Sequence, residues 1–278
     1  PSILIVGGLT IDVFADGRRA PGGSVIHAGL AALADGARVE TLTVTGPEPE
    51  AAEGRARLAS FGPVSAVDAA ATTTYGHADV DGLRVLTLVA GGGSVSPRAA
   101  RALARPDVVL FAPIAHELTT AAAGEIAAAL DAPTTAFLIQ GWLRHLVVGE
   151  PVRPLRIDEV PEDRWRTFST GDLVVVSSED LADGLDDPFG QARALRARIG
   201  ERPVLVVTLG TDGYLLDDPR ADRMVATVPR RVVEGAPTVG AGDTFGAVMA
   251  LRLAAGVSPG EAAGAGTDAV IALLEARR

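Results

Sequence analysis

Residues 237–246 read PTVGAGDTFG, and they join a glycine-rich turn to an apolar stretch that is typical of a helix. Asp243 stands where that helix would begin, and since helix N-termini favour negative charge it could be only a helix cap. The turn before it, Gly240-Ala241-Gly242, carries no side chain larger than a methyl group, and free N–H groups ahead of a helix bind anions. A carboxylate beside an anion would repel it unless the carboxylate took part in the reaction, for example as a base that deprotonates a hydroxyl.

The composition narrows the classes of protein to consider. With 278 residues the chain can form one large domain or two modest ones. Its 25 basic and 35 acidic residues give a net charge of −10 without a long basic stripe, which argues against a nucleic-acid partner. No apolar run reaches the roughly 18 to 20 residues of a membrane span, and the first residues resemble a strand and not a signal peptide. We therefore expect a cytoplasmic protein with no membrane partner.

Three residue types are missing, and their absence excludes several chemistries. The chain has no cysteine, so disulfides, thiolate metal sites and cysteine nucleophiles are excluded. It also has no lysine, which excludes the P-loop GxxxxGK[ST] and any Schiff-base mechanism. Asparagine is absent as well, and the many alanines and arginines suggest a compositional bias of the genome as the reason.

Short apolar runs alternate with alanine-rich stretches along most of the chain, which predicts a mostly parallel sheet with helices on both faces. The predicted strands are 3–8, 39–46, 107–114, 134–141, 172–178 and 203–210, and the predicted helices are 22–37, 51–62, 119–130 and 187–200.

Two segments depart from this alternation. Residues 72–93 alternate with a period of two around Asp81-Gly82, which predicts a β-hairpin that projects as a flap or an edge. Residues 146–168 are rich in proline and charge, and we interpret them as a surface excursion. Since no linker of low complexity appears, we expect one α/β domain over residues 1–278.

In open parallel sheets, ligands bind where strand carboxyl ends and helix N-termini meet, and the turn before Asp243 would lie there. TVGAGD (238–243) resembles the carboxy-terminal signature of the ribokinase-like (PfkB) carbohydrate kinases, D-T-x-G-A-G-D. The resemblance implies a three-layer α/β/α fold with a small, reduced β lid, its hairpin at about residues 72–90. It also implies transfer of the ATP γ-phosphate to an alcohol of a sugar-like substrate, with Mg²⁺.

The resemblance also implies roles for individual residues. In this family the last aspartate of the signature, here Asp243, is the catalytic base, and the small residues Gly240, Ala241 and Gly242 form the anion hole. Other matching stretches are GGLTID (7–12), the Gly-Gly pair after it, QGWLR (140–144) and VVTLGTDG (206–213). By this resemblance, the substrate is bound by Asp12, Gly22, Gly23, His27, Gln140 and Arg144. The nucleotide is bound by Thr208, Gly210, Gly213, Thr238, Ser177 and Asp180. Asp180 would also hold Mg²⁺ indirectly, through water.

Three positions depart from the family pattern. Pro237 stands where the signature begins with aspartate, and His27 stands where an asparagine often follows the Gly-Gly pair. The family's N-x-x-E motif, which organises magnesium and phosphate through water, is SSED (177–180) here. Ser177 and Asp180 keep a hydroxyl and a carboxylate, so a weakened magnesium network is one reading of the change.

Simpler structural roles remain open for most of these residues. Asp12 could end its strand or bind an arginine, Gly22-Gly23 could be only a tight turn, and His27 could pack in the core. Ser177 and Asp180 could cap a short helix. The three other histidines, His77, His116 and His145, are expected on the surface or behind the site. Glu179 is expected to be solvated, and Asp217-Asp218 is expected to form a turn.

The sequence as a whole predicts an ATP-dependent kinase of a small polyhydroxylated molecule, that is, a sugar, a nucleoside or a cyclitol. The alternative is a family member that binds such a ligand without turning it over, which the three departures would favour. A dehydrogenase is not supported, because no G-x-G-x-x-G follows the first strand. The resemblance leaves a monomer and a homodimer formed through the lid equally open.

Overall fold

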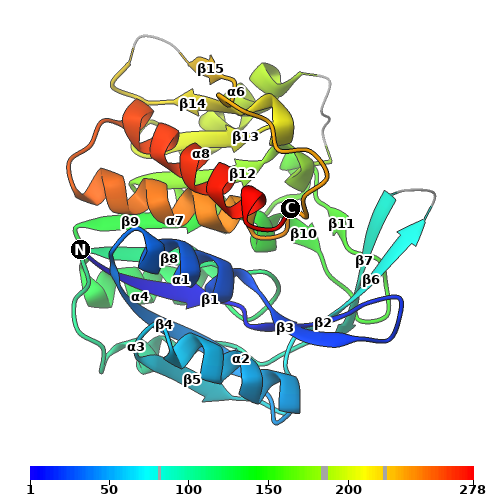
Figure 1. Cartoon of the computed structure of the whole chain (residues 1–278). Helices are drawn as coiled ribbons and strands as arrows, with labels where there is room; N and C mark the ends of the chain where they lie inside the picture. The colour runs from blue at the N-terminus through cyan, green and yellow to red at the C-terminus, as the bar shows by residue number, and fades with distance from the viewer. Residues whose placement is uncertain (81–82, 183–186, 222–223) are drawn as a thin grey trace.

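The apolar runs pair into one nine-stranded sheet in the computed structural model, which describes residues 1–80, 83–182, 187–221 and 224–278 (Figure 1). Its strand order is β15-β14-β13-β12-β9-β8-β1-β4-β5. All neighbours pair in parallel except β13–β14 and β14–β15, which are antiparallel. The strands are β1 (Ser2–Gly7), β4 (Arg38–Thr45), β5 (Val64–Asp68), β8 (Val108–Ala112), β9 (Thr134–Leu138), β12 (Leu173–Ser177), β13 (Val204–Thr208), β14 (Tyr214–Asp217) and β15 (Val225–Thr227).

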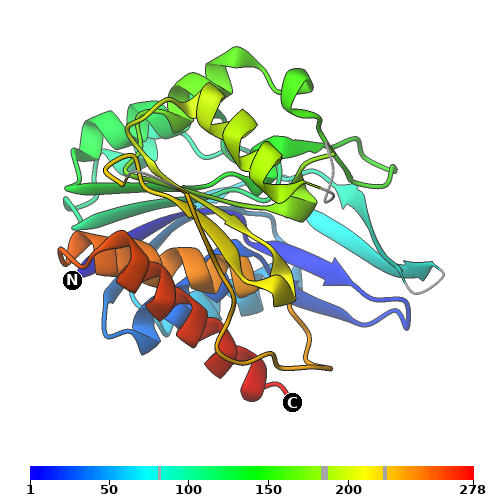
Figure 2. The ribbon, with the colours of Figure 1, turned by 90° about the horizontal axis from the view of Figure 1, so that it is seen from above.

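Helices cover both faces of this sheet (Figure 2). Along β1, Ile3 and Ile5 belong to one apolar core and Leu4 and Val6 to the other, because successive strand side chains point to opposite faces. The first core packs against α1 (Ser24–Ala34), α2 (Pro49–Ala59), α7 (Ala241–Ala254) and α8 (Pro259–Glu275). The second packs against α3 (Pro97–Ala100), α4 (Thr120–Leu130), α5 (Glu162–Phe168) and α6 (Pro188–Ile199).

A separate four-stranded sheet forms the lid, in the order β3-β2-β6-β7. The predicted hairpin supplies β6 (Thr74–Val80) and β7 (Leu83–Ala90), while its predicted turn, Asp81-Gly82, lies outside the described residues. The other two strands, β2 (Thr10–Val13) and β3 (Arg19–Gly22), come from the short segment before α1. The lid is therefore a four-stranded sheet, larger than the hairpin alone.

The interpretation of residues 146–168 as a surface excursion is wrong for its second half. Helix α5 buries Trp165 and Phe168 completely, and both side chains belong to the second core. Phe168 packs against Trp142 with ring centroids 5.3 Å apart. The shorter elements nearby and elsewhere are β10 (Arg144–His145), β11 (Arg153–Pro154), η1 (Gln140–Leu143), η2 (Ile157–Glu159), η3 (Ser178–Asp180) and η4 (Gly210–Asp212).

The turn predicted at Asp217-Asp218 begins directly after Asp217, which is the last residue of β14. β14 lies next to the edge strand β15, and Asp218 accepts a hydrogen bond from the Arg220 N–H at 3.0 Å. Among the residues that the structure describes, no helix is both long and apolar enough to span a membrane.

Candidate active site

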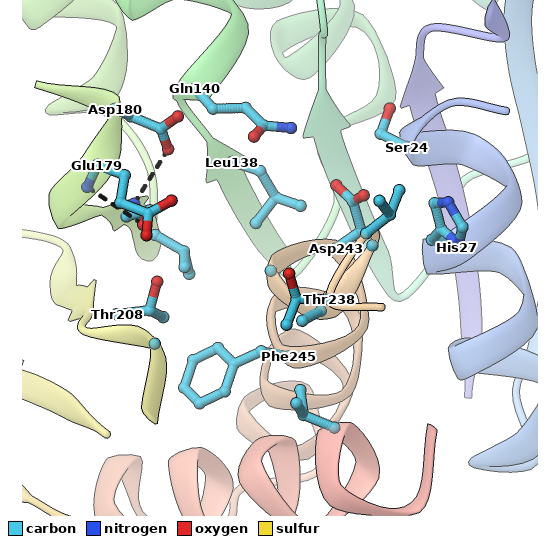
Figure 3. Close-up of a pocket in the computed structure, with 18 of the residues that line it drawn as sticks. Ser24, His27, Leu138, Gln140, Glu179, Asp180, Thr208, Thr238, Asp243 and Phe245 are labelled. Atoms are coloured by element: carbon cyan, nitrogen blue, oxygen red, sulfur yellow. Dashed lines mark hydrogen bonds between the residues drawn. The ribbon is translucent and has the colours of Figure 1, made fainter. Parts of the chain in front are cut away.

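A cleft of about 610 Å³ lies at the carboxyl ends of the parallel strands, between the main sheet and the lid (Figure 3). Its lining comes from the ends of β9, β12 and β13, the N-termini of α1 and α7, and the lid strands β2 and β6. This is where ligands bind in open parallel sheets. Every residue predicted for the site lines this cleft except Gly22.

The glycine-rich turn forms the N-terminus of α7. Gly240 is the N-cap, with a left-handed backbone (φ 80°), and a Cβ at this position would lie 2.2 Å from the His27 Cγ. Ala241 donates its N–H to the Thr238 carbonyl at 3.0 Å, so the prediction that this amide is free is wrong. Within the described residues the Gly242 and Asp243 N–H groups have no acceptor, which leaves these two amides for an anion.

Asp243 lies in the first turn of α7 and is 7% exposed. In the described part of the chain, no hydrogen bond or ion pair ends on its carboxylate, so the structure gives it no capping role. Burial raises the pKa of Asp243 to about 7; the nearby Arg144 lowers it and Asp180 raises it further. A carboxylate with this pKa and no protein donor is suited to accept a proton at neutral pH.

A pH dependence follows from this pKa. If Asp243 is the base, it must be ionised to act, so kcat/KM is expected to rise through about pH 7 and then level off. The check is kcat/KM measured from about pH 5 to 9, in wild type and in Asp243→Asn. The variant should lose this inflection from its residual rate. A wild-type profile that is flat near pH 7 would contradict the assignment.

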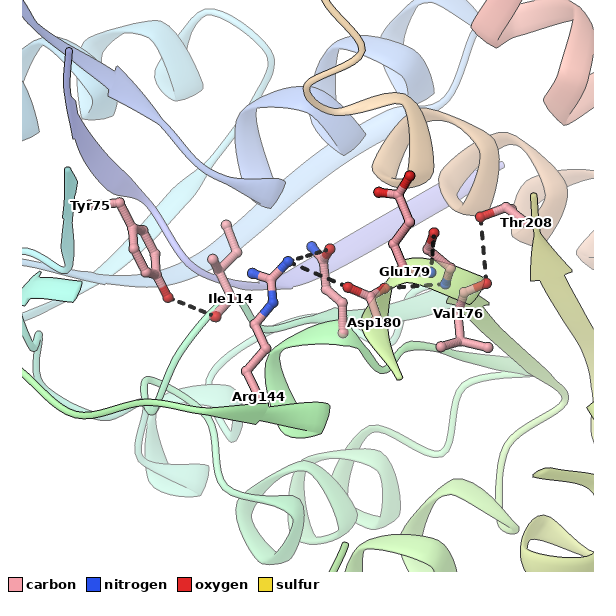
Figure 4. A network of polar contacts seen from close by, with 9 residues as sticks. Tyr75, Ile114, Arg144, Val176, Glu179, Asp180 and Thr208 are labelled. Atoms are coloured by element: carbon pink, nitrogen blue, oxygen red, sulfur yellow. Dashed lines mark hydrogen bonds and ion pairs between the residues drawn. The ribbon is translucent and has the colours of Figure 1, made fainter. Parts of the chain in front are cut away.

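Arg144 and Asp180, which both act on the pKa of Asp243, belong to a polar network. Figure 4 shows this network. Arg144 pairs with Asp180 at 3.4 Å and donates to the Gln140 Oε1 at 3.4 Å. Asp180 also accepts the Ser177 N–H at 3.1 Å, and Ser177 accepts the Glu179 N–H at 3.3 Å, which is a capping box. Both oxygens of Asp180 are thus used by protein donors, and burial raises its pKa although Arg144 lowers it.

Glu179 belongs to the cleft as well, which the sequence reading missed. Its side chain is exposed, yet it lines the cleft next to Ser177 and Asp180. The expectation that Glu179 is solvated is confirmed, whereas its place in the lining of the cleft was not predicted.

One end of the cleft is formed by the loops after β13 and before α7. Thr208 ends β13, and its hydroxyl donates to the Val176 carbonyl at 3.5 Å. Gly210, Gly213 and Thr238 line the same end of the cleft. Apolar residues that were not predicted for the site complete this end of the cleft: Pro229, Val232, Val233, Val270, Ile271 and Leu274.

Asp12 lies at the lid end of the cleft. Its Oδ1 is 3.1 Å from the His77 Nε2 and 3.5 Å from the Thr10 hydroxyl. Gly22 does not line the cleft, but a Cβ there would lie 2.3 Å from the Asp12 Oδ2. Gly22 therefore makes room for the carboxylate instead of contacting a ligand, whereas Gly23 does line the cleft.

His77 was expected on the surface or behind the site, and the structure corrects this. Its side chain is 12% exposed, lines the cleft and stacks on Phe14 with centroids 5.2 Å apart. Near it, Tyr75, Leu86 and Ile114 give the lid end an apolar wall, and the Tyr75 hydroxyl donates to the Ile114 carbonyl at 3.0 Å. His116 instead lies 3.2 Å from the Leu146 carbonyl, outside the lining.

His27 lies between these ends, on α1 against Gly240. Burial lowers the pKa of His27 to about 4, and the nearby Arg277 and Arg57 lower it further, so the ring is neutral at pH 7. It lines the cleft and also packs against the turn at Gly240.

No protein-family model and no curated protein matches the sequence. Solved structures do match. A pyrophosphate-dependent kinase in the ribokinase family, complexed with a pyrophosphate analog and myo-inositol, has a TM-score of 0.77 and 17% identity, over 98% of this chain and 94% of that one. Fructokinase from Vibrio cholerae O395 has a TM-score of 0.73 and 17% identity, over 100% and 99%. Arabidopsis thaliana ribokinase, complexed with ribose and ATP, has a TM-score of 0.69 and 16% identity, over 99% of both chains.

These likenesses extend over nearly the whole of each chain. They show that this protein has the ribokinase-like fold, so the predicted α/β/α architecture with a small β lid is confirmed.

Proposed function

We propose that the protein is a phosphotransferase that moves the γ-phosphate of ATP to a hydroxyl of a sugar, nucleoside or cyclitol. The observation that carries the proposal is Asp243, a buried carboxylate without a protein donor, beside two free amides at a helix N-terminus. Transfer of a phosphoryl group to an alcohol requires a base for the hydroxyl proton and, beside it, hydrogen-bond donors for the charge of the phosphoryl group.

The reaction can be written with these residues. Asp12 and His77 orient the acceptor, and Asp243 takes the proton of the attacking hydroxyl. The hydroxyl oxygen forms the new P–O bond as the bond between the γ-phosphorus and the bridging oxygen breaks, and ADP leaves. The Gly242 and Asp243 amides hydrogen-bond the negative charge on the transferring group. Arg144 holds Asp180 and Gln140 in place beside the reacting centre.

The apolar end of the cleft supports ATP as the donor. Val233, Ile271 and Leu274 form a small apolar cluster there, suited to an adenine ring. Pyrophosphate is the second candidate, because one structurally similar enzyme is pyrophosphate-dependent. Pyrophosphate has no adenine ring, so its binding would depend mainly on positively charged side chains that are free of other partners. The arginines in the described lining are both paired, Arg144 with Asp180 and Arg231 with Glu275.

Magnesium, when bound with the donor, would neutralise phosphate charge. Asp180 suits this role through water, because each of its two oxygens already accepts a hydrogen bond, from the Ser177 N–H and from Arg144. The Glu179 carboxylate beside it adds a second acid that suits a hydrated cation.

The proposal is tested by a panel of sugars, nucleosides and inositols offered with ATP or with pyrophosphate, each with Mg²⁺. Phosphorylated product with one acceptor class and ATP is expected. Product with pyrophosphate alone would correct the donor. Ligand-dependent melting shifts without product from either donor would favour the alternative, a binding protein without turnover.

Asp12→Ala tests the acceptor end. The variant is expected to raise the acceptor KM by about 10- to 100-fold, the usual loss for hydrogen bonds to a charged group, while the donor KM changes little. Steady-state kinetics with each substrate varied provides the measurement. Asp16→Ala is a matched control on the same lid, since Asp16 is exposed in the turn between β2 and β3 and accepts the Arg18 N–H. Equal effects of Asp12→Ala on both KM values would contradict this role.

A further inference from the structure

Arg277 follows α8 and reaches back to the anion-binding turn. Its Nη1 donates to the Pro237 carbonyl at 3.0 Å and to the Val239 carbonyl at 2.5 Å. A single guanidinium nitrogen thus joins the two carbonyls on either side of Thr238, directly before Gly240. Arg277 itself does not line the cleft.

This contact fixes the orientation of the peptide groups in the turn. The other two carbonyls are also held: Thr238 accepts from the Ala241 N–H, and Gly240 accepts from the Thr244 N–H, both at 3.0 Å. The described peptide bonds are trans, so each C=O points away from the N–H of the same peptide. With the Val239 carbonyl bound to Arg277, the Gly240 N–H is directed away from Arg277, and the start of α7 is held in one conformation.

Arg277 also differs from its neighbours in charge pairing. Arg230 and Arg231, in the loop before the turn, pair with Asp268 and Glu275 at 2.9 and 2.5 Å. Among the described residues, no carboxylate pairs with Arg277. Its positive charge is therefore uncompensated behind a turn whose front amides are free, and Arg57 adds a second cation close enough to lower the pKa of both His27 and Arg277, after burial.

We propose that Arg277 is a positioning residue for phosphoryl transfer: it holds the anion-binding turn by two carbonyls and places a fixed positive charge behind it, without touching substrate. The inference rests on the proposed function. It assigns a role to Pro237 as well, since the carbonyl of this residue is one of the two acceptors.

The first test compares three variants on an acceptor that the panel has identified. Arg277→Ala is expected to lower kcat by about tenfold or more, as misplaced catalytic groups do, with the acceptor KM unchanged. Arg277→Lys, which keeps the charge and can donate to both carbonyls, should retain most of the activity. Arg278→Ala is the matched control, because it removes the same charge from an exposed neighbour and should behave as wild type.

The second test separates positioning from general destabilisation. Guanidinium chloride below denaturing concentrations should restore activity to Arg277→Ala, and KCl is a second arm because backbone carbonyls also coordinate K⁺. Tetramethylammonium chloride at equal ionic strength is the control, since it neither donates hydrogen bonds nor coordinates carbonyls. Rescue by guanidinium or K⁺ beyond this control supports the proposal. A folded Arg277→Ala that neither cation restores overturns it, and so does one with wild-type kcat.

Failure of the proposed function would look different. If wild type phosphorylates nothing in the panel, pyrophosphate binding measured by calorimetry replaces turnover as the readout. Weaker binding to Arg277→Ala than to Arg278→Ala then supports the role of Arg277 in the turn, and equal binding overturns it.

Discussion

Asp243→Asn is expected to lower kcat by about 10² or more while leaving ATP binding intact, because the amide cannot take the proton of the acceptor hydroxyl. Asparagine has nearly the shape of aspartate, so the N-terminus of α7 and its free amides should persist. Turnover and ATP binding are measured separately, by product formation and by calorimetry. Asp163→Asn is the matched control, since Asp163 lies in the first turn of α5 but is exposed and outside the cleft. Normal turnover by Asp243→Asn would rule out Asp243 as the base.

The same variant should also be more stable than wild type. The folded-state pKa of Asp243, about 7, lies above its ordinary value of 3.8, so the folded protein holds this proton more tightly than the unfolded chain does. The contribution of Asp243 to the free energy of unfolding is therefore lost as the pH rises from 3.8 through about 7. Asparagine does not ionise, so Asp243→Asn should melt at a higher temperature than wild type well above pH 7. A lower melting temperature there would indicate a structural role for the carboxylate.

Gly240→Ala is expected to lower kcat by roughly 10², comparable to the loss of one anion-hole donor. Two effects coincide at this position. The new Cβ would lie 2.2 Å from the His27 Cγ, so the turn or the ring must move, and the left-handed backbone itself costs about 1–2 kcal/mol for a residue with a Cβ.

Two further variants separate these effects. Gly256 has nearly the same φ, 79°, but no atom within 4 Å of an added Cβ, so Gly256→Ala should lose stability and keep its activity. Adding His27→Ala to Gly240→Ala should recover part of kcat if the clash displaces the turn. Wild-type activity of Gly240→Ala would mean that the turn tolerates the shift and does not depend on this packing.

The sheet was predictable because runs such as VLVVT are short, rich in β-branched residues and apolar on both faces, as strands buried on both sides are. The helix that ends the segment 146–168 was not, because EDRWRTF has four charged residues in one short helix that conceal its two buried aromatics. A three-residue spacing of Trp165 and Phe168 was the available signal.

The site was predictable at the Gly240 turn, because a backbone that must come close to a ligand requires small residues, and these are visible in the sequence. It was not predictable where side chains meet across the fold. His77 reaches Asp12 from a strand 65 residues further along the chain, and Arg277 contacts carbonyls, which every residue has. The free amide expected at Ala241 is used by a local turn that no residue type announces.

The lid rests on a small apolar cluster in which Tyr75 and Leu88 of the lid pack with Ala115 and Leu146 from loops outside it, separate from the two cores of the main sheet. Asp12 and His77 belong to the lid, whereas Asp243 and its turn are anchored in the main sheet's packing. Substitutions that alter the lid should therefore cost the main cores little. If the proposed function holds, such a layout allows acceptor preference to drift over evolutionary time while the transfer chemistry is inherited unchanged.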